Sequence, residues 1–524
     1  MSTPGAYFRL ARAGWVMVRE GVVAAMPGSE LEGPARLGWR AAKLLARRRA
    51  RKRDRSERIA RAIERLGPSY VKLGQFLATR PDVVGHEIAL DLASLQDRMA
   101  KFPRAASVTA IEGSIGVPVD DLYLTLDEPV AAASIAQVHS ATIDDDGEAR
   151  KVAVKVIRPG VRRRFHNDLE GFFLAARLQE RFVPSSRRLK PVEVAQTLAQ
   201  TTKIEMDLRL EAAALSELAE NIAGDPGFRV PWVDWRRTGR DVVTMEWIDG
   251  VKMSDVEGLR AAGHDPEALA ATLIQSFLRH TLRDGFFHAD MHPGNLFVEA
   301  DGTIVAVDFG IMGRLGRKER RFLAEILYGF IRRDFRRVAE VHFEAGYVPR
   351  HHNVAAFAQA LRAIGEPIHG QPAETISMAK LLTLLFEVTE LFDMQTRPEL
   401  LLLQKTMVVV EGVARTLDPH FNMWKTAEPV VGSWIADNLG PRAVLTDARE
   451  GVSAVLSLAR QAPDLAARTE RLSREIDAMA ENGLRFDAET ANAIGRAEAR
   501  HTRWGRAALW VIAIALAVMA WKLV

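Results

Sequence analysis

The sequence predicts an α+β fold in two lobes, with a β-rich lobe followed by an α-rich one. Two runs rich in β-branched residues, 135–143 and 151–157, flank the turn-forming residues 144–147 and therefore predict a hairpin. From Pro266 onward the apolar residues recur almost throughout at helical spacing. A chain of 524 residues is also too long for one ordinary hydrophobic core, and it fits two lobes with appendages.

Composition restricts the chemistry that the chain can perform. Hydrophobic residues make up 48% and charged residues 26%, close to the averages of globular proteins, so the chain is expected to fold. The absence of cysteine excludes disulfides, thiolate metal sites and thiol nucleophiles, and catalysis must use oxygen and nitrogen groups. The net charge of +4 is small for this length, and we expect no nucleic-acid partner.

The first 60 residues predict an amphipathic helix followed by a basic linker. Arg9, Arg12 and Glu20 interrupt any apolar stretch, which excludes a secretory signal. The apolar residues at helical spacing are Tyr7, Leu10, Ala11, Val18 and Val22. With the basic block at 47–58, this pattern indicates contact with anionic lipid. An ordinary docking helix and a solvated charged linker are the alternatives.

Residues 504–524 predict a C-terminal transmembrane helix. The stretch 507–521 carries no charge, Arg503 and Arg506 precede it, and Lys522 closes it. It is shorter than the roughly 20 residues that span a bilayer, but it is flanked by tryptophans, which suit membrane interfaces. Arg503 and Arg506 lie on the N-terminal side of the apolar stretch, and positive residues next to a membrane span favour the cytoplasmic side. The bulk of the chain, which precedes them, is therefore expected on the cytoplasmic side of the inner membrane. A buried C-terminal helix is the alternative.

The strongest signal for chemistry lies in the loop 287–297 and the segment that follows it. In protein kinases a catalytic-loop Asp orients the attacking hydroxyl, and an Asn after four intervening residues holds magnesium. Asp290 and Asn295 have this spacing, and Asp308 begins a D-F-G sequence, whose Asp binds Mg²⁺ in that template. A carboxylate after an apolar strand is costly to bury without a partner, which a metal ion would supply. The alternative is that these polar residues form turns and caps.

Lys155 is predicted to neutralise the phosphates of ATP. It lies in the strand 152–156, V-A-V-K-V, which is similar to the V-A-I-K strand of kinases. In that template the lysine pairs with a helix glutamate, and Glu205 and Glu211 are the candidates in the acidic helix downstream. The alternative is an edge lysine whose charged end reaches solvent.

An alanine-rich loop occupies the place of the kinase glycine-rich loop. The predicted nucleotide-binding residues are Ala131, Ala132, Ala133, Ser134, Ile135, Ala136, Gln137 and Val138. Alanine seldom adopts positive φ angles, and its methyl group stands where the backbone must approach phosphate. This loop should therefore bind nucleotide differently from the glycine-rich loop of an ordinary kinase. Glu246, near the end of the predicted strand 241–248, is expected at a hinge facing adenine, with an ordinary strand exit as the alternative.

Taken as a set, these motifs resemble the UbiB family of atypical kinase-like proteins. The alanine-rich loop, the lysine strand and the loop 288–295 carry the resemblance. The K-x-G-Q sequence at 72–75 makes it specific, because the family has this motif on an N-terminal helical extension. The family's E-x-D motif is matched at 205–207, and Leu-Gln-Asp stands at 95–97 as the family has it. The resemblance covers roughly residues 5–430.

The resemblance implies a role in ubiquinone biosynthesis. It also implies that Lys72 and Glu205 face one another across the pocket and block peptide access, so that ATPase action on lipid or on partner enzymes is preferred to protein phosphorylation. The expected partners are anionic membrane lipids and either quinone precursors or ubiquinone-biosynthesis enzymes. Whether the chain forms a homodimer is left open. Considered alone, Lys72 would be an ordinary surface lysine.

The expected organisation is a protein-kinase-like two-lobed fold with an N-terminal helical extension and a C-terminal transmembrane helix. Its parts are the amphipathic helix and basic linker (1–60), the helical extension (61–125), the N-lobe (126–250), the C-lobe (251–430), C-terminal helices (431–503) and the anchor (504–524).

The leading hypothesis is a membrane-associated atypical kinase or ATPase that binds Mg-ATP. The residues assigned catalytic roles are Asp290, Lys155, Lys72, Glu205 and Glu211, with Asn295 and Asp308 as metal ligands. One alternative is a small-molecule kinase resembling aminoglycoside phosphotransferases, which would need an open acceptor pocket. The other is a nucleotide-binding scaffold without turnover.

Overall fold

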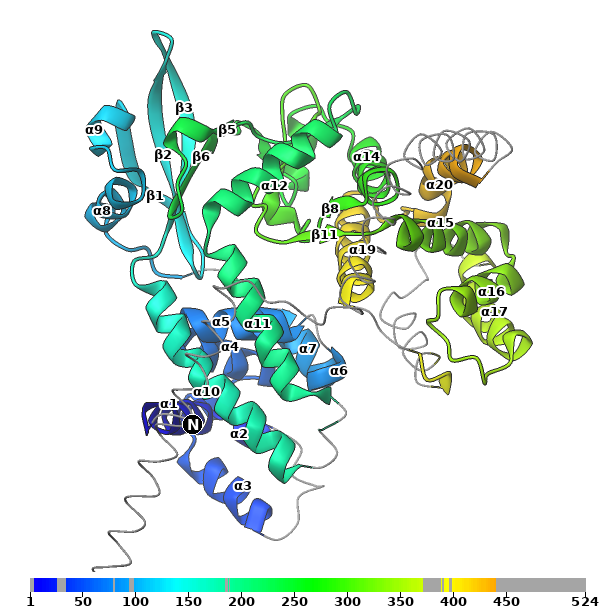
Figure 1. Cartoon of the computed structure of the whole chain (residues 1–524), viewed down its shortest axis with the longest axis horizontal. Coiled ribbons are helices and arrows are strands. Elements are labelled where there is room, and N and C mark those ends of the chain that lie inside the picture. Colours follow the sequence, from blue (N-terminus) through cyan, green and yellow to red (C-terminus); the bar gives the residue numbers. More distant parts are fainter. Residues whose placement is uncertain are drawn as a thin grey trace, which may run out of the picture. The chain divides into compact units, whose positions relative to one another are not determined.

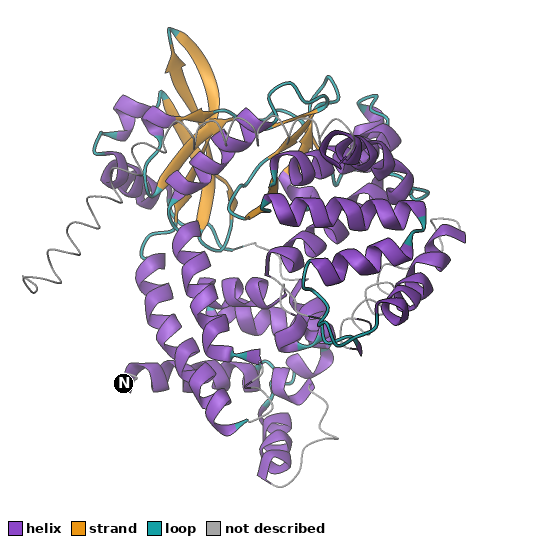
Figure 2. Ribbon diagram, turned by 45° about the vertical axis from the view of Figure 1, so that its right-hand side comes forward, coloured by secondary structure: helices purple, strands orange, loops and turns teal. Residues whose placement is uncertain are grey.

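The computed structural model describes residues 4–25, 34–78, 81–93, 99–183, 187, 189–370, 388, 391–394 and 398–439 (Figure 1). Helices and strands both occur in these ranges, which confirms the predicted α+β class (Figure 2). None of the helices in these ranges is long and apolar enough to cross a membrane. The predicted anchor at 504–524, residues 440–503 of the C-terminal helices predicted at 431–503, and the Leu-Gln-Asp sequence at 95–97 lie outside the described residues.

A five-stranded antiparallel sheet forms the centre of the N-lobe. Its strands are β1 (Thr125–Ala132), β2 (Ala136–Asp145), β3 (Glu148–Ile157), β6 (Val242–Glu246) and β5 (Val233–Asp234), in the spatial order β1-β2-β3-β6-β5. The predicted hairpin is confirmed as β2 and β3, which pair from Ala136 with Ile157 to Asp145 with Glu148. Asp146 and Gly147 form the two-residue turn, and both have positive φ, 54° and 91°. Asp-Gly suits this turn because Asp tolerates that region and Gly adopts it freely.

Two short helices cover the outer face of this sheet. They are α8 (Arg104–Ile115) and α9 (Val119–Leu122), seen beside the hairpin in Figure 1. Ile111 of α8 packs with Val152, Val154 and Val156, the alternate residues of β3. Because successive strand residues point to opposite faces, Lys155 faces the other side of the sheet.

The N-terminal extension consists of helices packed around a small apolar core. They are α1 (Pro4–Arg19), α2 (Val22–Ala25), α3 (Pro34–Leu45), α4 (Arg55–Leu66), α5 (Pro68–Ala78), α6 (Pro81–Val84) and α7 (His86–Ala93), with a 3₁₀ turn at Ala50–Lys52. Val22, Ile59, Ile63 and Val71 are buried in that core. The structure therefore confirms a helix at the N-terminus and a helical segment around the K-x-G-Q sequence.

The extension is attached to the first helix after the N-lobe hairpin. That helix, α10 (Val161–Phe182), presents Phe172 to Tyr70 of α5 in an edge-to-face contact with centroids 5.0 Å apart. Arg164 of α10 donates to the carbonyl of Leu66, and this guanidinium lies where a Cβ on Gly67 would stand. Gly67, which has a φ of 104°, is therefore needed both for the turn between α4 and α5 and for this close approach.

The helical stretch after β3 is divided into three helices, and its breaks separate the two candidate glutamates. After α10 come α11 (Pro191–Glu205) and α12 (Leu208–Asn221). Asp207 begins α12 by accepting a hydrogen bond from the backbone N–H of Arg209. Glu205 thus ends one helix and Glu211 lies in the first turn of the next, so they project from different elements.

The C-lobe begins with two small sheets. One has the order β4-β10-β9-β7 and contains β4 (Phe228–Arg229), β10 (Ile304–Ala306), β9 (Leu296–Val298) and β7 (Val251–Lys252); the other pairs β8 (Phe286–His288) with β11 (Met312–Arg314). β9 and β10 pair as an antiparallel hairpin, with Asp301 and Gly302 in the turn between them. The loop after β8 and the loop after β10 both run between these two sheets.

The rest of the C-lobe is helical, as the spacing after Pro266 predicts. Its helices are α13 (Val256–Ala261), α14 (Pro266–Arg279), α15 (Arg317–Arg332), α16 (Phe335–Glu344), α17 (Val354–Gly370), α19 (Pro398–Leu417) and α20 (Met423–Leu439), with a π-helical turn at His280–Asp284 and a 3₁₀ turn at Pro293–Asn295. A further 3₁₀ turn, Trp235–Arg237, lies between β5 and β6 of the N-lobe sheet. Phe277, Phe287 and Phe309 belong to its main core. A separate core joins α16 and α17 through Phe335 and Phe357.

Arg229 links the two main sheets. From β4 it donates two hydrogen bonds to Glu246, at the end of β6, with distances of 2.8 and 3.0 Å. It also donates two to Glu299, at the start of the turn between β9 and β10, with distances of 2.7 and 2.6 Å. Bidentate pairs of this kind fix orientation as well as distance.

Candidate active site

The N-lobe sheet and the C-lobe meet at Lys155. Its Nζ lies 2.7 Å from Glu211 Oε1 on α12 and 2.8 Å from Asp308 Oδ1, just after β10. Lys155 and Glu211 are buried, whereas the side chain of Asp308 is 44% exposed. The structure therefore joins Glu211, and not Glu205, to the strand lysine, and it leaves part of the Asp308 carboxylate open to a ligand.

The charges of these groups depend on each other. Burial alone would lower the pKa of Lys155, but Asp308 and Glu211 outweigh it and raise that pKa well above its usual range. Burial also raises the pKa of Glu211. For Asp308, burial acts upward, but the adjacent lysine holds the pKa far below its usual range. Lys155 is thus a fixed cation and Asp308 a fixed anion at neutral pH.

The backbone at Asp308 has a conformation that is unusual for a residue with a side chain. Its φ is 66°, in the left-handed region that residues other than glycine seldom adopt. The next residues are tied to the same carboxylates, since Phe309 N–H donates to Glu211 Oε1 at 3.2 Å and Gly310 N–H to Asp308 Oδ1 at 3.4 Å. Strain of this kind persists where the surroundings over-determine it, and functional sites are where it collects.

Asp290 and Asn295 come from the loop after β8. Asn295 is buried at the end of a 3₁₀ turn, and its Nδ2 donates to the backbone carbonyl of Asp290 at 3.1 Å. The carbonyl of Asn295 accepts from Val307 N–H at 2.8 Å, one residue before Asp308. These two bonds bring the catalytic-loop residues and the D-F-G sequence into one site.

Buried groups hold the loop after β8 that carries Asp290 and Asn295. The imidazole of His288 accepts the backbone N–H of Asp290 at Nδ1, 3.0 Å away, and burial lowers the pKa of His288, which keeps the ring neutral. The Phe309 ring packs edge-on against His288 with centroids 5.0 Å apart. The Thr406 hydroxyl on α19 lies within hydrogen-bond distance of two carbonyl oxygens, that of Ala289 at 3.0 Å and that of Leu402 at 2.8 Å. The loop is therefore braced by both the D-F-G segment and a distant helix.

Lys72 and Glu205 form a second buried ion pair. Lys72 Nζ on α5 lies 2.5 Å from Glu205 Oε2 at the end of α11, and the side chains are 13% and 3% exposed. Burial raises the pKa of Glu205 and Lys72 lowers it, with further contributions from Asp308 and Lys155. The pair therefore lies within electrostatic reach of the Lys155 site, and it joins the extension to the helix before α12.

The alanine-rich loop is the turn between β1 and β2. Ala133 N–H donates to the carbonyl of Ala136 at 2.8 Å, which closes the turn. The guanidinium of Arg158 donates to the carbonyls of Ala100 and Ala133 at 3.0 and 3.3 Å. Met99 N–H donates to the carbonyl of Ala132 at 3.2 Å. The loop is thus bound to the segment that leaves the extension.

The predicted nucleotide residues divide between the two faces of the sheet. Val138 is paired directly with Lys155 and shares its face. Gln137 points to the opposite face, where its amide bonds to both backbone groups of Phe102 and to Ser107 of α8. Strand alternation explains this difference from the expectation for Gln137, whose side chain holds the extension in place.

The side chain of Glu246 pairs within the protein, and the expected contact of this hinge segment with adenine stays a prediction. Its carboxylate is occupied by Arg229, and its backbone N–H donates to the carbonyl of Trp232 at 3.0 Å. A carboxylate at a strand end can pair with any neighbouring arginine, and the sequence did not indicate that Arg229 would lie beside it.

The residues present fit a bound magnesium ion. Since Nδ2 of Asn295 is used by the carbonyl of Asp290, the amide oxygen is the atom left for another ligand. The partly exposed Asp308 carboxylate supplies a second oxygen. Oxygen ligands are those that Mg²⁺ prefers, and the ion usually keeps waters and binds substrate phosphates as well.

Two residues that brace the site were not found from the sequence. Thr406 lies 111 positions after Asn295 in a helix with no motif, so no local pattern indicates its contact with the catalytic loop. Arg158 follows the lysine strand directly, and its position beside the alanine-rich loop could have been inferred from the hairpin register.

Comparison with known proteins identifies the family. Residues 94–342 match the ABC1 atypical kinase-like domain, and residues 361–422 match the UbiB helical domain. The first of these matches confirms the kinase-like fold that the D-F-G and V-A-V-K sequences predict.

Proteins similar to this chain cover most of its length. One from Marinobacter nauticus, named "Probable protein kinase UbiB", is 38% identical over 465 residues, or 87% of this chain and 84% of that protein. Another of the same name, from Aeromonas hydrophila, is 38% identical over 477 residues, or 90% of this chain and 87% of that protein. A solved structure of a Mycobacterium tuberculosis protein in complex with erythromycin has 24% identity and a TM-score of 0.45, covering 68% of this chain and 90% of the other. The chain belongs to the UbiB family of atypical kinase-like proteins.

Proposed function

We propose that this protein binds Mg-ATP at the Lys155 site and hydrolyses it at a membrane in support of ubiquinone biosynthesis. The observation that carries the proposal is the convergence of the cation Lys155 with Asp308, next to the linked residues Asp290 and Asn295. These side chains come from separate segments and match the roles of the kinase template one by one.

Each residue has a definite task in this proposal. Lys155, held between two carboxylates, would neutralise the phosphates, while Asp308 and the Asn295 amide oxygen would hold Mg²⁺. When bound, the ion would offset the charge of the phosphates. Asp290, fixed through its backbone by His288 and Asn295, would orient the attacking oxygen. Positioning and preorganised charge are the main sources of acceleration in phosphoryl transfer.

The buried Lys72–Glu205 pair supports ATP hydrolysis over protein phosphorylation. A helix of the extension carries Lys72 to within electrostatic reach of the site, where a peptide acceptor would need space. Water needs no docking surface, so a closed approach is compatible with hydrolysis. An open acceptor pocket, which the small-molecule kinase alternative needs, is difficult to combine with this pair.

The membrane and the quinone pathway enter the proposal through the family and the terminal sequences. The chain is 38% identical to proteins named "Probable protein kinase UbiB". The first helix exposes Tyr7, Phe8 and Trp15, apolar side chains that suit a lipid interface. We propose inner-membrane attachment through this helix and residues 504–524, with anionic lipid and quinone precursors or their enzymes as partners.

The test is phosphate release by the purified full chain with Mg-ATP, with and without anionic vesicles that contain a quinone-like lipid. Asp308→Asn should lower turnover by at least about 10²-fold, the loss typical of removing one preorganised electrostatic group. Asp301→Asn is the matched control, because it makes the same change on the exposed turn between β9 and β10 and should keep near-normal activity.

Three outcomes would decide against the proposal. Wild-type turnover equal to that of Asp308→Asn would exclude the enzymatic assignment, and full complementation by Asp308→Asn of a cell lacking the protein would favour the scaffold. A phosphorylated small molecule formed in place of free phosphate would favour the small-molecule kinase.

A further inference from the structure

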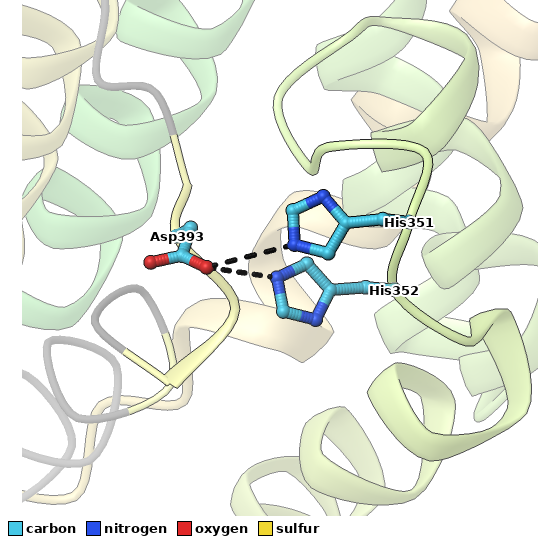
Figure 3. Close-up of side chains that lie close together, drawn as sticks. All are labelled: His351, His352 and Asp393. Carbon is cyan, nitrogen blue, oxygen red and sulfur yellow. Dashed lines mark hydrogen bonds and ion pairs between the residues drawn. The ribbon is translucent and has the colours of Figure 1, made fainter.

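Two histidines and an aspartate meet on the C-lobe, away from the residues assigned to Mg-ATP. His351 and His352 lie in the connection between α16 and α17, and Asp393 lies in the described segment 391–394 (Figure 3). Both rings direct Nε2 toward the same carboxylate oxygen, Asp393 Oδ2, at 3.7 Å from His351 and 3.2 Å from His352. Among the described residues, this is the one group of three such side chains whose ligand atoms all lie within 4.8 Å of one another.

The spacing of these atoms agrees with a small tetrahedral ion. A zinc ion binds imidazole nitrogen and carboxylate oxygen at about 2.0–2.2 Å, which places any two ligand atoms about 3.3–3.5 Å apart. The separations of 3.7 and 3.2 Å bracket this value. Two imidazoles and one carboxylate also form a set that zinc sites with an open fourth position use.

The fold holds two of the three ligands in place. Phe392 is buried against Phe357 of α17 with ring centroids 4.9 Å apart, and it contacts the His352 ring at 5.3 Å. This packing places Asp393, the next residue, beside the histidine loop. Asp393 has a φ of 48°, in the left-handed region where a side chain is disfavoured. The backbone is therefore strained at Asp393, the residue that provides the carboxylate.

A simple ion pair explains the arrangement less well. The two imidazole rings are tilted by 38° to one another, with centroids 4.1 Å apart. His352 Nε2 lies within hydrogen-bond distance of Asp393 Oδ2, at 3.2 Å, but His351 Nε2, at 3.7 Å, is too far away for a hydrogen bond to the same oxygen. One cation shared by the three side chains accounts for the direction of both rings.

We propose that His351, His352 and Asp393 bind one divalent transition-metal ion, Zn²⁺ by chemical preference, with water at the fourth position. Imidazole nitrogen favours Zn²⁺ over Mg²⁺, whose ligands are oxygens in near-octahedral geometry, so this site and the Asp308 site take different ions. His351 and Asp393 are 67% and 68% exposed, which leaves the ion accessible to solvent and to chelators.

The bound ion would join the loop before α17 to the segment around Phe392. These elements belong to or adjoin residues 361–422, which match the UbiB helical domain. An ion that binds only the folded arrangement stabilises it by an amount that grows with the logarithm of the free-ion concentration once that concentration exceeds Kd. The proposal does not depend on ATP hydrolysis and is tested without nucleotide.

The experiment titrates the full chain with Zn²⁺ by calorimetry, in excess Mg²⁺ to saturate oxygen sites, and repeats the titration with Co²⁺ while visible absorption is recorded. We expect one ion per chain, a tetrahedral Co²⁺ spectrum and a thermal midpoint that rises with Zn²⁺ and falls with chelator. His351→Ala and Asp393→Asn should weaken binding by more than about 100-fold, the upper range for loss of a mere outer-shell partner. Both side chains are exposed, so these variants should fold normally.

His166→Ala is the matched control, since it removes an exposed histidine from α10 and should bind like the wild type. Wild-type protein without a stoichiometric Zn²⁺ site would overturn the proposal. Equal affinity in wild type, His351→Ala and Asp393→Asn would also overturn it, because the ion would then bind elsewhere. An octahedral Co²⁺ spectrum would contradict the ligand set.

Discussion

Lys72→Met is expected to destabilise the protein, because it leaves Glu205 buried without its cation. The two charged atoms lie 2.5 Å apart, and the side chains are 13% and 3% exposed, so water replaces little of the lost interaction. Methionine retains most of the apolar length of lysine, and the change therefore removes chiefly charge. Breaking a buried pair at one partner costs about 3–5 kcal/mol in the free energy of unfolding.

The pH dependence of this loss has a definite sign. Burial already raises the pKa of Glu205 and Lys72 lowers it, so removal of Lys72 raises the folded-state pKa further. An acid with a raised folded-state pKa keeps its proton longer in the folded protein, and stability falls as the pH rises from the unfolded pKa to the folded pKa. The deficit of Lys72→Met should therefore be larger at about pH 8 than at about pH 5.

The assay is unfolding in urea, monitored by tryptophan fluorescence. The quantity compared at each pH is the urea concentration at the midpoint of unfolding. Lys203→Met is the matched control, because Lys203 is exposed on the same helix as Glu205 and its loss should stay within about 0.5 kcal/mol. The double variant Lys72→Met with Glu205→Gln should regain most of the loss, since a neutral amide replaces the unpaired charge.

Three results would refute this reasoning. One is a midpoint for Lys72→Met no lower than that of Lys203→Met. Another is a deficit that does not change with pH, which would mean that the ionisation of Glu205 is not involved. The third is a double variant as unstable as Lys72→Met, since the loss would then come from packing and not from charge.

Three further changes test the loops and the anchor. Thr406→Val removes the hydroxyl bonded to the carbonyl of Ala289, and it should lower kcat about tenfold, or about 1.4 kcal/mol, with ATP affinity nearly kept; equal kcat would show that the brace is dispensable. Ala132→Gly should change the affinity for ATP and ADP severalfold by freeing the backbone, and unchanged affinities would remove any special role of alanine there. Deletion of 504–524 should move protein to the soluble fraction unless the N-terminal helix retains it, and a fractionation of membranes reads the result.

Local patterns predicted much of the fold because they act over a few residues. The two-residue turn Asp146-Gly147 favours the hairpin of β2 and β3, because both residues have positive φ. In the longer loop between β9 and β10, Gly302 alone has positive φ. The spacing of Asp290, Asn295 and Asp308 indicated one site, and the structure brings these residues together through the Asn295 bonds.

Choices between alternative partners could not be predicted. From the sequence, Glu205 and Glu211 were equally good candidates to pair with Lys155. The helix break at Asp207 separates them, so that Glu205 pairs with Lys72 and Glu211 with Lys155. Gln137 stood inside a segment expected to bind nucleotide, but its face is fixed by pairing with β3 and by α8, which lies far away in sequence. Tertiary packing, and not local propensity, decides such cases.

The four hydrogen bonds of Arg229 have a consequence for the rate at which nucleotide enters and leaves. Glu246 ends a strand of the five-stranded sheet, whereas Arg229 and the turn that carries Glu299 belong to the smaller sheet, so any rotation of one sheet against the other must stretch the two bonds between Arg229 and Glu246. Arg229 and both carboxylates are only partly buried, so dissolved salt weakens these contacts. Higher ionic strength should therefore ease this rotation, and for the proposed ATP site we expect ADP release to become faster as salt is added.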